Sequence, residues 1–249
     1  MSYYRDVARG LVAGQSVVTK FGYNKDLDTG ASGETIRPQG GLYVPPTAAE
    51  TLNVVSTSAA DDNGSTGCQY LRIQGLDADY KEVTEDIFMD GTTIVTTTNS
   101  FIAVNRCVGI FFGTGQTNAG VITATQSSSG KVLGYIVAGV GITQQCIYTI
   151  PVDHEAQLNK LHLEALRIAG GSSPRVQFIY NTYVPESNGI YKTIDETIDT
   201  AVNNTYILDI PYASETAHKT TIWIDAVTTA NDTAVTGRFY LNQYPRNIQ

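Results

Sequence analysis

The chain has 249 residues and a formal net charge of −8, with only 16% charged residues. An acidic chain of this kind argues against a nucleic-acid groove, which needs clustered lysine and arginine, and its longest apolar run is too short to cross a bilayer. The many threonines, glycines, serines and tyrosines favour strands and tight turns over helices.

The first 50 residues differ from the rest. Residues 6–14 can form one helical turn before Gly10 and Gly14 interrupt it, and residues 16–23 can form a strand. Glycines and prolines then punctuate an irregular stretch, which is uncommon inside a compact domain. We therefore expect residues 1–50 to form an extended N-terminal arm that buries its apolar residues on another surface. The candidate interface residues are Tyr3, Tyr4, Val17, Val18, Phe21, Tyr23, Leu42, Tyr43 and Val44.

Residues 51–142 form the first expected β block. Within it, residues 69–112 predict an antiparallel meander: a strand over 70–74, an alternating strand over 81–89, a turn at Asp90-Gly91 and a longer strand over 101–112. A meander buries one face, so a second sheet must cover it. We find no reactive cluster along this stretch and expect function at its edges and loops.

Residues 143–249 form the second expected β block. Residues 156–168 have helical spacing as well as strand alternation, and we prefer the strand because Leu161, Leu163 and Ala165 alternate with polar neighbours. Further strands are expected over 175–183, 189–194, 206–210, 220–226 and 234–244. This succession predicts an all-β protein with an antiparallel β-sandwich or jelly-roll fold. The two blocks are either two sandwiches or one interleaved sandwich.

No constellation of residues points to catalysis. Cys68, Cys107 and Cys146 are expected to be buried free thiols, because free cysteine is among the most buried residue types. His162 and Glu164 share a strand face but lack further zinc ligands at known spacing. The acidic turns at 61–63 and 77–82 lack the EF-hand spacing of a calcium site. We expect no catalytic residues, no metal and no cofactor.

The first 110 residues resemble virion structural proteins of tailed double-stranded DNA bacteriophages, with the nearest likeness to capsid decoration (cement) or head-fibre proteins of phages of aquatic bacteria such as cyanobacteria. The stretches that carry the resemblance are residues 6–14, 18–24, 40–43, 73–85 and 91–106. The resemblance implies a non-enzymatic, oligomeric β protein bound to the major capsid protein on the capsid surface. Closed trimers are the favoured oligomer, since shell symmetry axes favour closed rings.

The segment that begins at Met1 has no apolar stretch of a secretory signal, so we expect synthesis in the host cytoplasm, and neither a nucleic acid nor a membrane as a partner. The alternative function is a tail or head-fibre module that binds a receptor or carbohydrate through loops such as 127–130 or 187–189.

Overall fold

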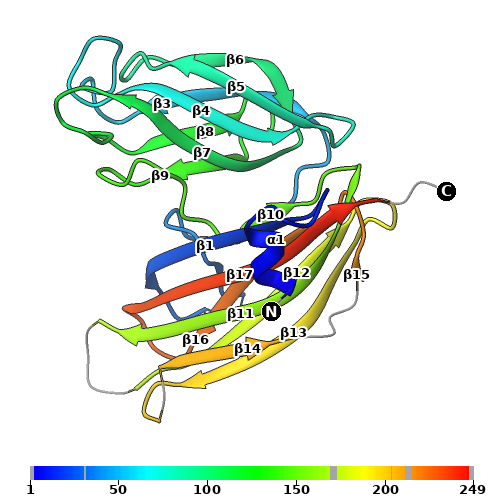
Figure 1. The fold of residues 1–249 in the computed structure, drawn as a ribbon. Coiled ribbons are helices and arrows are strands. Elements are labelled where there is room, and N and C mark those ends of the chain that lie inside the picture. The colour runs from blue at the N-terminus through cyan, green and yellow to red at the C-terminus, as the bar shows by residue number, and fades with distance from the viewer. Residues whose placement is uncertain (1–2, 31, 169–172, 203, 211–214, 247–249) are drawn as a thin grey trace. The chain divides into compact units, whose positions relative to one another are not determined.

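A computed structural model describes residues 3–30, 32–168, 173–202, 204–210 and 215–246. The chain forms two compact units: unit 1 combines residues 1–43 and 145–249, and unit 2 comprises residues 44–144 (Figure 1). Both units are built from antiparallel sheets, and the only helix in the described part of the chain is α1 (Tyr3–Ala8). The expected all-β fold is confirmed. No helix among the described residues is long and apolar enough to span a membrane.

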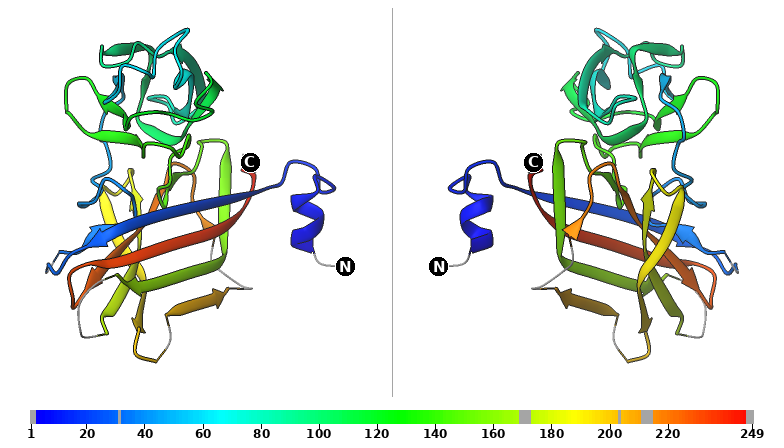
Figure 2. Two further views of the ribbon diagram at one scale, coloured as in Figure 1. Left: turned by 90° about the vertical axis from the view of Figure 1, so that its left-hand side faces the viewer. Right: turned by 90° about the vertical axis from the view of Figure 1, so that its right-hand side faces the viewer.

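Unit 1 contains two sheets. In the first, the order is β1 (Ser16–Leu27), β17 (Thr233–Pro245), β11 (His154–Arg167) and β14 (Thr205–Asp209), with β15 (Glu215–Thr216) also paired to β11. In the second, the order is β10 (Ile147–Thr149), β16 (Thr221–Thr228), β12 (Arg175–Val184) and β13 (Gly189–Asp199), with β2 (Glu34–Thr35) also paired to β16. Figure 2 shows β1 and β17 running side by side.

The strand order of unit 1 is that of a jelly roll. Taken in chain order without the short β2 and β15, its strands are β1, β10, β11, β12, β13, β14, β16 and β17. The first pairs with the last, the second with the seventh, the third with the sixth and the fourth with the fifth, all antiparallel. This is a long hairpin folded over on itself, and β17–β11 and β16–β12 pairing completes the two sheets.

The second strand of this jelly roll is split in sequence. Along β16, Ala226 and Asp225 pair with β2, whereas Trp223 to Thr221 pair with β10. Between them, the Cys146 amide donates to the Ile36 carbonyl at 3.0 Å, and the Ile36 amide donates to Ile224 at 2.9 Å. Residues 34–36 and 146–149 therefore act as one split strand, and unit 2 is inserted into it.

Two glycines make room for the split strand. Gly22 of β1 and Gly237 of β17 are register partners. A Cβ added at Gly22 would lie 2.3 Å from the Ile36 carbonyl oxygen and 2.5 Å from the Cys146 nitrogen, and one at Gly237 would lie 2.9 Å from Ile36 Cδ1. The absence of a side chain at both positions lets the split strand pack directly on this sheet.

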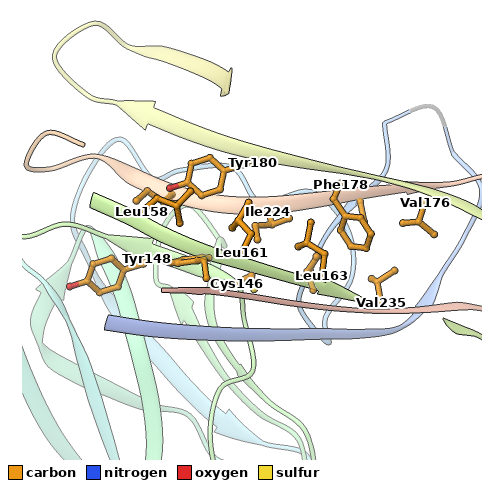
Figure 3. Packing of buried hydrophobic residues seen from close by; sticks show 14 of the residues in the cluster. Cys146, Tyr148, Leu158, Leu161, Leu163, Val176, Phe178, Tyr180, Ile224 and Val235 are labelled. Atoms are coloured by element: carbon orange, nitrogen blue, oxygen red, sulfur yellow. The ribbon is translucent and has the colours of Figure 1, made fainter. Parts of the chain in front are cut away.

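The hydrophobic core of unit 1 lies between its two sheets. Leu161, Leu163 and Ala165 of β11 are each 1% exposed and alternate with partly exposed or exposed residues, as a strand requires. They face Val176 and Phe178 of β12 (Figure 3). The expected strand over 156–168 is confirmed, and the helical alternative is wrong because burial repeats every two residues.

Unit 2 also has two sheets. One has the order β6 (Val95–Phe101), β3 (Glu50–Ser56), β8 (Ile122–Gln126) and β9 (Val132–Ile136), and the other has the order β5 (Glu82–Phe88), β4 (Cys68–Leu76) and β7 (Ala103–Phe112). The expected strand over 101–112 is present as β7 from Ala103, two residues later than expected, because Phe101 still belongs to β6 of the first sheet. The expected meander is wrong: β4 lies in the centre between β5 and β7, and β6, which comes between β5 and β7 in sequence, belongs to the other sheet.

The expectation that residues 1–50 form an extended arm is wrong, because much of this segment is part of unit 1. Strand β1 pairs with β17 from Ser16–Gln243 to Leu27–Thr233, and both Leu27 and Ile36 are fully buried. The segment finds its partners near the far end of the chain, which local sequence patterns do not reveal. The compact units accordingly divide the chain at residues 43/44 and 144/145, where the sequence analysis placed boundaries at 50/51 and 142/143.

Candidate functional site

A row of aromatic side chains crosses the three-stranded sheet of unit 2. Tyr70 of β4 pairs in register with Phe88 of β5 on one side and with Phe111 of β7 on the other. Directly opposed residues of a regular antiparallel pair project from the same face, which places Tyr70 and Phe88 together, whereas Phe111 lies opposite Tyr70 at a register irregularity of β4 and β7. The Tyr70 and Phe88 ring centroids are 3.8 Å apart, and Phe88 and Phe111 remain 50% and 57% exposed. We call Tyr70, Phe88 and Phe111 the aromatic row.

The next row on this face is charged. Arg72 donates to both carboxylate oxygens of Asp86 at 2.7 Å, two residues along each strand from Tyr70 and Phe88. The hydrogen bonds from Arg72 lower the pKa of Asp86, and those same bonds raise the pKa of Arg72. Arg106 follows on β7 opposite Gln74 and is exposed.

This face has the composition of a protein interface. Aromatic residues and arginine are enriched in interfaces, and large exposed aromatics that cluster on a sheet are unusual on a free surface. The paired Arg72 and Asp86 hold their side chains in place beside the row, which lowers the entropy lost on binding. The arrangement can bind another protein surface.

The aromatic row was not predicted from the sequence, although Phe88 carried a signal for it. In the alternating stretch 81–89, Phe88 has the same parity as the wet-face residues Thr84 and Asp86. An aromatic residue on the polar face of a strand is the observation that could have identified it. Phe111 gave no such signal, because β7 has a register irregularity opposite Tyr70 that shifts its alternation.

The expected interface residues of the N-terminal segment do not form one surface. Val18 packs against the core of unit 1, and the Phe21 ring lies 5.2 Å from the Arg238 guanidinium. Tyr43 is 7% exposed and stacks edge-on against Trp223 at 5.7 Å. Val17 and Tyr23 are half-buried on β1, Leu42 and Val44 are exposed, and the side chains of Tyr3 and Tyr4 lie outside the described ones.

Tyr43 belongs to a buried polar network of unit 1. Asp225 accepts hydrogen bonds from Thr35 Oγ1 at 2.6 Å, Asn181 Nδ2 at 2.9 Å and Trp223 Nε1 at 3.1 Å. Thr35 Oγ1 in turn accepts from the Tyr43 amide at 2.7 Å. Burial raises the pKa of Asp225 despite these donors. The network ties the segment after β2 to β16, which is a structural role.

The polar residues considered as metal ligands also have structural partners. His162 Nε2 lies 3.0 Å from Glu164 Oε1 on the surface of β11. The fully buried Asp61 accepts from Ser56 Oγ and from the amides of Cys68, Ala119 and Gly120, so it holds loops of unit 2 together. Among the described residues, no group of three or more His, Cys, Asp or Glu is placed to hold a metal ion.

The three cysteines are buried free thiols, as expected. Burial raises the pKa of Cys68 and of Cys146 to about 12, so both stay protonated near neutral pH. Cys146 Sγ donates to the Gly237 carbonyl at 2.8 Å beside the split strand. These thiols fill space next to glycines and are packing residues.

Unit 1 contains a pocket of about 480 Å³ between its two sheets. Its lining comes from both sheets, and includes Leu158, Tyr180, Thr182, Ile194, Glu215 and Thr220. Figure 3 shows the Tyr180 ring beside Leu158, with its hydroxyl on the Leu158 side. The pocket has the size of a small-molecule site.

Comparison with known proteins identifies no family. No protein-family model matches the chain, and no curated protein matches it. The solved structures that are similar include two of infectious bursal disease virus. One, of the Gt strain, has 10% identity and a TM-score of 0.19, covering 99% of this chain and 83% of that one. The other, a crystal structure of the VP2 subviral particle, has 11% identity and a TM-score of 0.23, covering 94% and 73%. Both scores are too low to carry an argument about this chain.

Proposed function

We propose that this protein is a non-enzymatic virion structural protein, a capsid decoration (cement) protein that binds the major capsid protein on the outer shell. The observation that carries the proposal is the aromatic row of unit 2, in which Phe88 and Phe111 are exposed on the three-stranded sheet. The jelly roll of unit 1 supports a virion role by analogy, since viral capsid domains are among the proteins that use this fold.

Attachment through the aromatic row replaces attachment through an N-terminal arm. Strand β1 is paired with β17 within unit 1 and Tyr43 is buried, whereas Phe88 and Phe111 remain exposed. Many weak contacts repeated around a symmetric shell add up through multivalency. The protein acts as a homo-oligomer, with a trimer favoured on three-fold axes, is made in the host cytoplasm and needs neither nucleic acid nor membrane.

The abundance of the protein in purified particles tests the proposal. Quantitative mass spectrometry against the major capsid protein should find hundreds of copies per particle, because a cement protein follows the repeat of the shell. About a dozen copies would place the protein at the tail or a vertex, and absence from particles would refute a virion role.

The alternative is a receptor- or carbohydrate-binding module of a tail or head fibre. One observation favours it: the Ser187 hydroxyl lies 3.2 Å from the Tyr191 hydroxyl at the exposed 185–191 turn, and paired hydroxyls beside an aromatic ring suit a sugar. Jelly rolls also occur in lectins. A glycan array distinguishes the two functions, because a cement protein should give no signal on it.

A further inference from the structure

A β-bulge in β7 enlarges the exposed apolar surface around the aromatic row. Tyr70 of β4 lies opposite Phe111, whereas the next residue, Leu71, lies opposite Gly109, so Ile110 is the extra residue of β7. Ile110 is 41% exposed and Phe111 is 57% exposed. Side chains of a regular strand alternate between its two faces, so two consecutive exposed apolar residues are a consequence of the bulge.

The residues on either side of this exposed pair face the interior of unit 2. A Cβ added at Gly109 would overlap the Phe112 ring and lie 3.1 Å from the Sγ atom of Cys68, which is fully buried. Gly109 and Phe112 therefore point inward, toward Cys68, and Ile110 and Phe111 between them point outward. The bulge adds Ile110 to the apolar surface that a partner can contact.

The charged residues on the same outer face differ in whether they are paired. Arg72 is neutralised by Asp86, with Nη2 and Oδ2 2.7 Å apart. Arg106 lies opposite Gln74 in a regular part of the pairing between β4 and β7, so it projects from the same face as Arg72. Arg106 is exposed, and among the residues that the structure describes it has no ion-pair partner. This unpaired cation stands out in a chain of net charge −8.

The spacing of the strand residues separates the apolar surface from this cation. Tyr70 and Gln74, which lie opposite Phe111 and Arg106, are four residues apart on β4. At about 3.3 Å per residue their Cα atoms are about 13 Å apart. A partner that covers the aromatic row also reaches Arg106, because standard interfaces take in about 20–30 residues on each side.

We propose that the shell surface bound by this face presents an apolar cavity to Ile110 and Phe111 and, about 13 Å away, a carboxylate that pairs with Arg106. The inference rests on the proposed function and specifies its partner. Apolar contacts are non-directional, whereas a charge pair at a fixed distance from them sets the orientation of docking. Arg72 does not have this role, because Asp86 already neutralises it.

The salt dependence of binding tests the charge pair on the full chain. Co-sedimentation with capsid shells stripped of the protein is measured at 0.1 M and 1 M NaCl, between which the Debye length falls from about 10 Å to about 3 Å. Arg106→Gln should weaken binding about fivefold at 0.1 M and less than about twofold at 1 M. Arg106→Lys keeps the charge and should stay within about twofold of the native protein at both concentrations.

Two further variants separate this inference from the proposed function. Phe111→Ala should lose about 30-fold at both salt concentrations, because an apolar contact is not screened. Lys25→Gln removes an exposed cation from unit 1 and should bind as the native protein does.

Native-like binding by Arg106→Gln at 0.1 M, an equal loss at both concentrations, or a loss no greater than that of Lys25→Gln would overturn the charge pair. In each of these cases weak binding by Phe111→Ala would leave attachment through the aromatic row intact. Native-like binding by Phe111→Ala would refute that attachment, and the inference with it.

Discussion

The amide of Cys146 donates a hydrogen bond to the carbonyl of Ile36 at 3.0 Å, although all of unit 2 separates the two residues in sequence. The bond joins the two pieces of the split strand beside β16 and shows where unit 2 is inserted. A jelly roll interrupted in its second strand depends on both flanking segments for its edge, so residues before and after unit 2 fold as one domain.

The close approach of the split strand to Gly22 makes that residue sensitive to substitution. Gly22→Ala should lower the free energy of unfolding by about 3 kcal/mol, because the new Cβ would overlap backbone atoms that cannot move aside. Chemical denaturation of the purified variant measures this loss. Gly30→Ala is the control, since an added Cβ there meets no atom within 4 Å. Equal stability of the two variants would contradict the packing at the split strand.

Removal of residues 1–43 should unfold unit 1. The deletion removes β1, β2 and the fully buried Leu27 and Ile36, each of which contributes about 1.5–3 kcal/mol of hydrophobic stabilisation, and it bares the edge of β17. Trp223 is the chain's single tryptophan and is 2% exposed in unit 1, so its fluorescence reports this unit alone. Emission should shift to that of the denatured protein. If the truncated protein keeps the emission of a buried tryptophan, unit 1 folds without residues 1–43, and this segment is an arm separate from the domain.

Much of the strand pattern follows from the sequence, because alternation is local. The buried Leu161, Leu163 and Ala165 predict β11 correctly, and Gly91 of the expected Asp-Gly turn has a positive φ of 55°. The split strand could not be predicted, because the residues around Ile36 carry no local pattern that indicates pairing with Cys146, which is distant in the sequence. The alternation of residues 81–89 places Phe88 on the polar face of its strand, so this part of the aromatic row could have been predicted. Phe111 could not, because it comes to lie opposite Tyr70 only through the pairing of β7 with β4.

The unpaired hydroxyl of Tyr180 predicts an unusual response in stability. Tyr180→Phe should leave the melting temperature of the ligand-free protein unchanged or raise it, because the substitution removes an unsatisfied buried hydroxyl and keeps the ring. Tyr148→Phe should lose about 1 kcal/mol, because it breaks the hydrogen bond to Gln243. Differential scanning calorimetry compares the two variants. A larger loss for Tyr180→Phe than for Tyr148→Phe would show that the Tyr180 hydroxyl has a partner.

Asp225 predicts a specific dependence of stability on pH. Its pKa is raised by burial in the folded chain, so the folded state binds the proton more tightly than the unfolded state. This contribution to stability is present at low pH and is lost as pH rises through the raised pKa. The difference in unfolding free energy between the native protein and Asp225→Asn should therefore be larger below the ordinary pKa of a carboxyl group than near neutral pH.

Asp86 is a control for the pH experiment, because its pKa is shifted in the opposite direction to that of Asp225. Its pKa is lowered by the hydrogen bonds from Arg72, so its contribution is present above the ordinary carboxyl range and is lost as pH falls. The difference between the native protein and Asp86→Asn should shrink on acidification. If the Asp225 difference also shrinks on acidification, the three hydrogen-bond donors outweigh burial and the assigned direction is wrong.

Binding of point variants to capsid shells stripped of the protein tests attachment through the aromatic row most directly. Phe111 is 57% exposed, so Phe111→Ala should leave folding intact, yet it should weaken co-sedimentation with the shells about 30-fold, as loss of an interface hot spot of about 2 kcal/mol does. Leu42→Ala removes a comparably exposed apolar side chain from the N-terminal segment and should bind as the native protein does. Full binding by Phe111→Ala would contradict attachment through the aromatic row, and loss of binding by Leu42→Ala would instead favour attachment through the N-terminal segment.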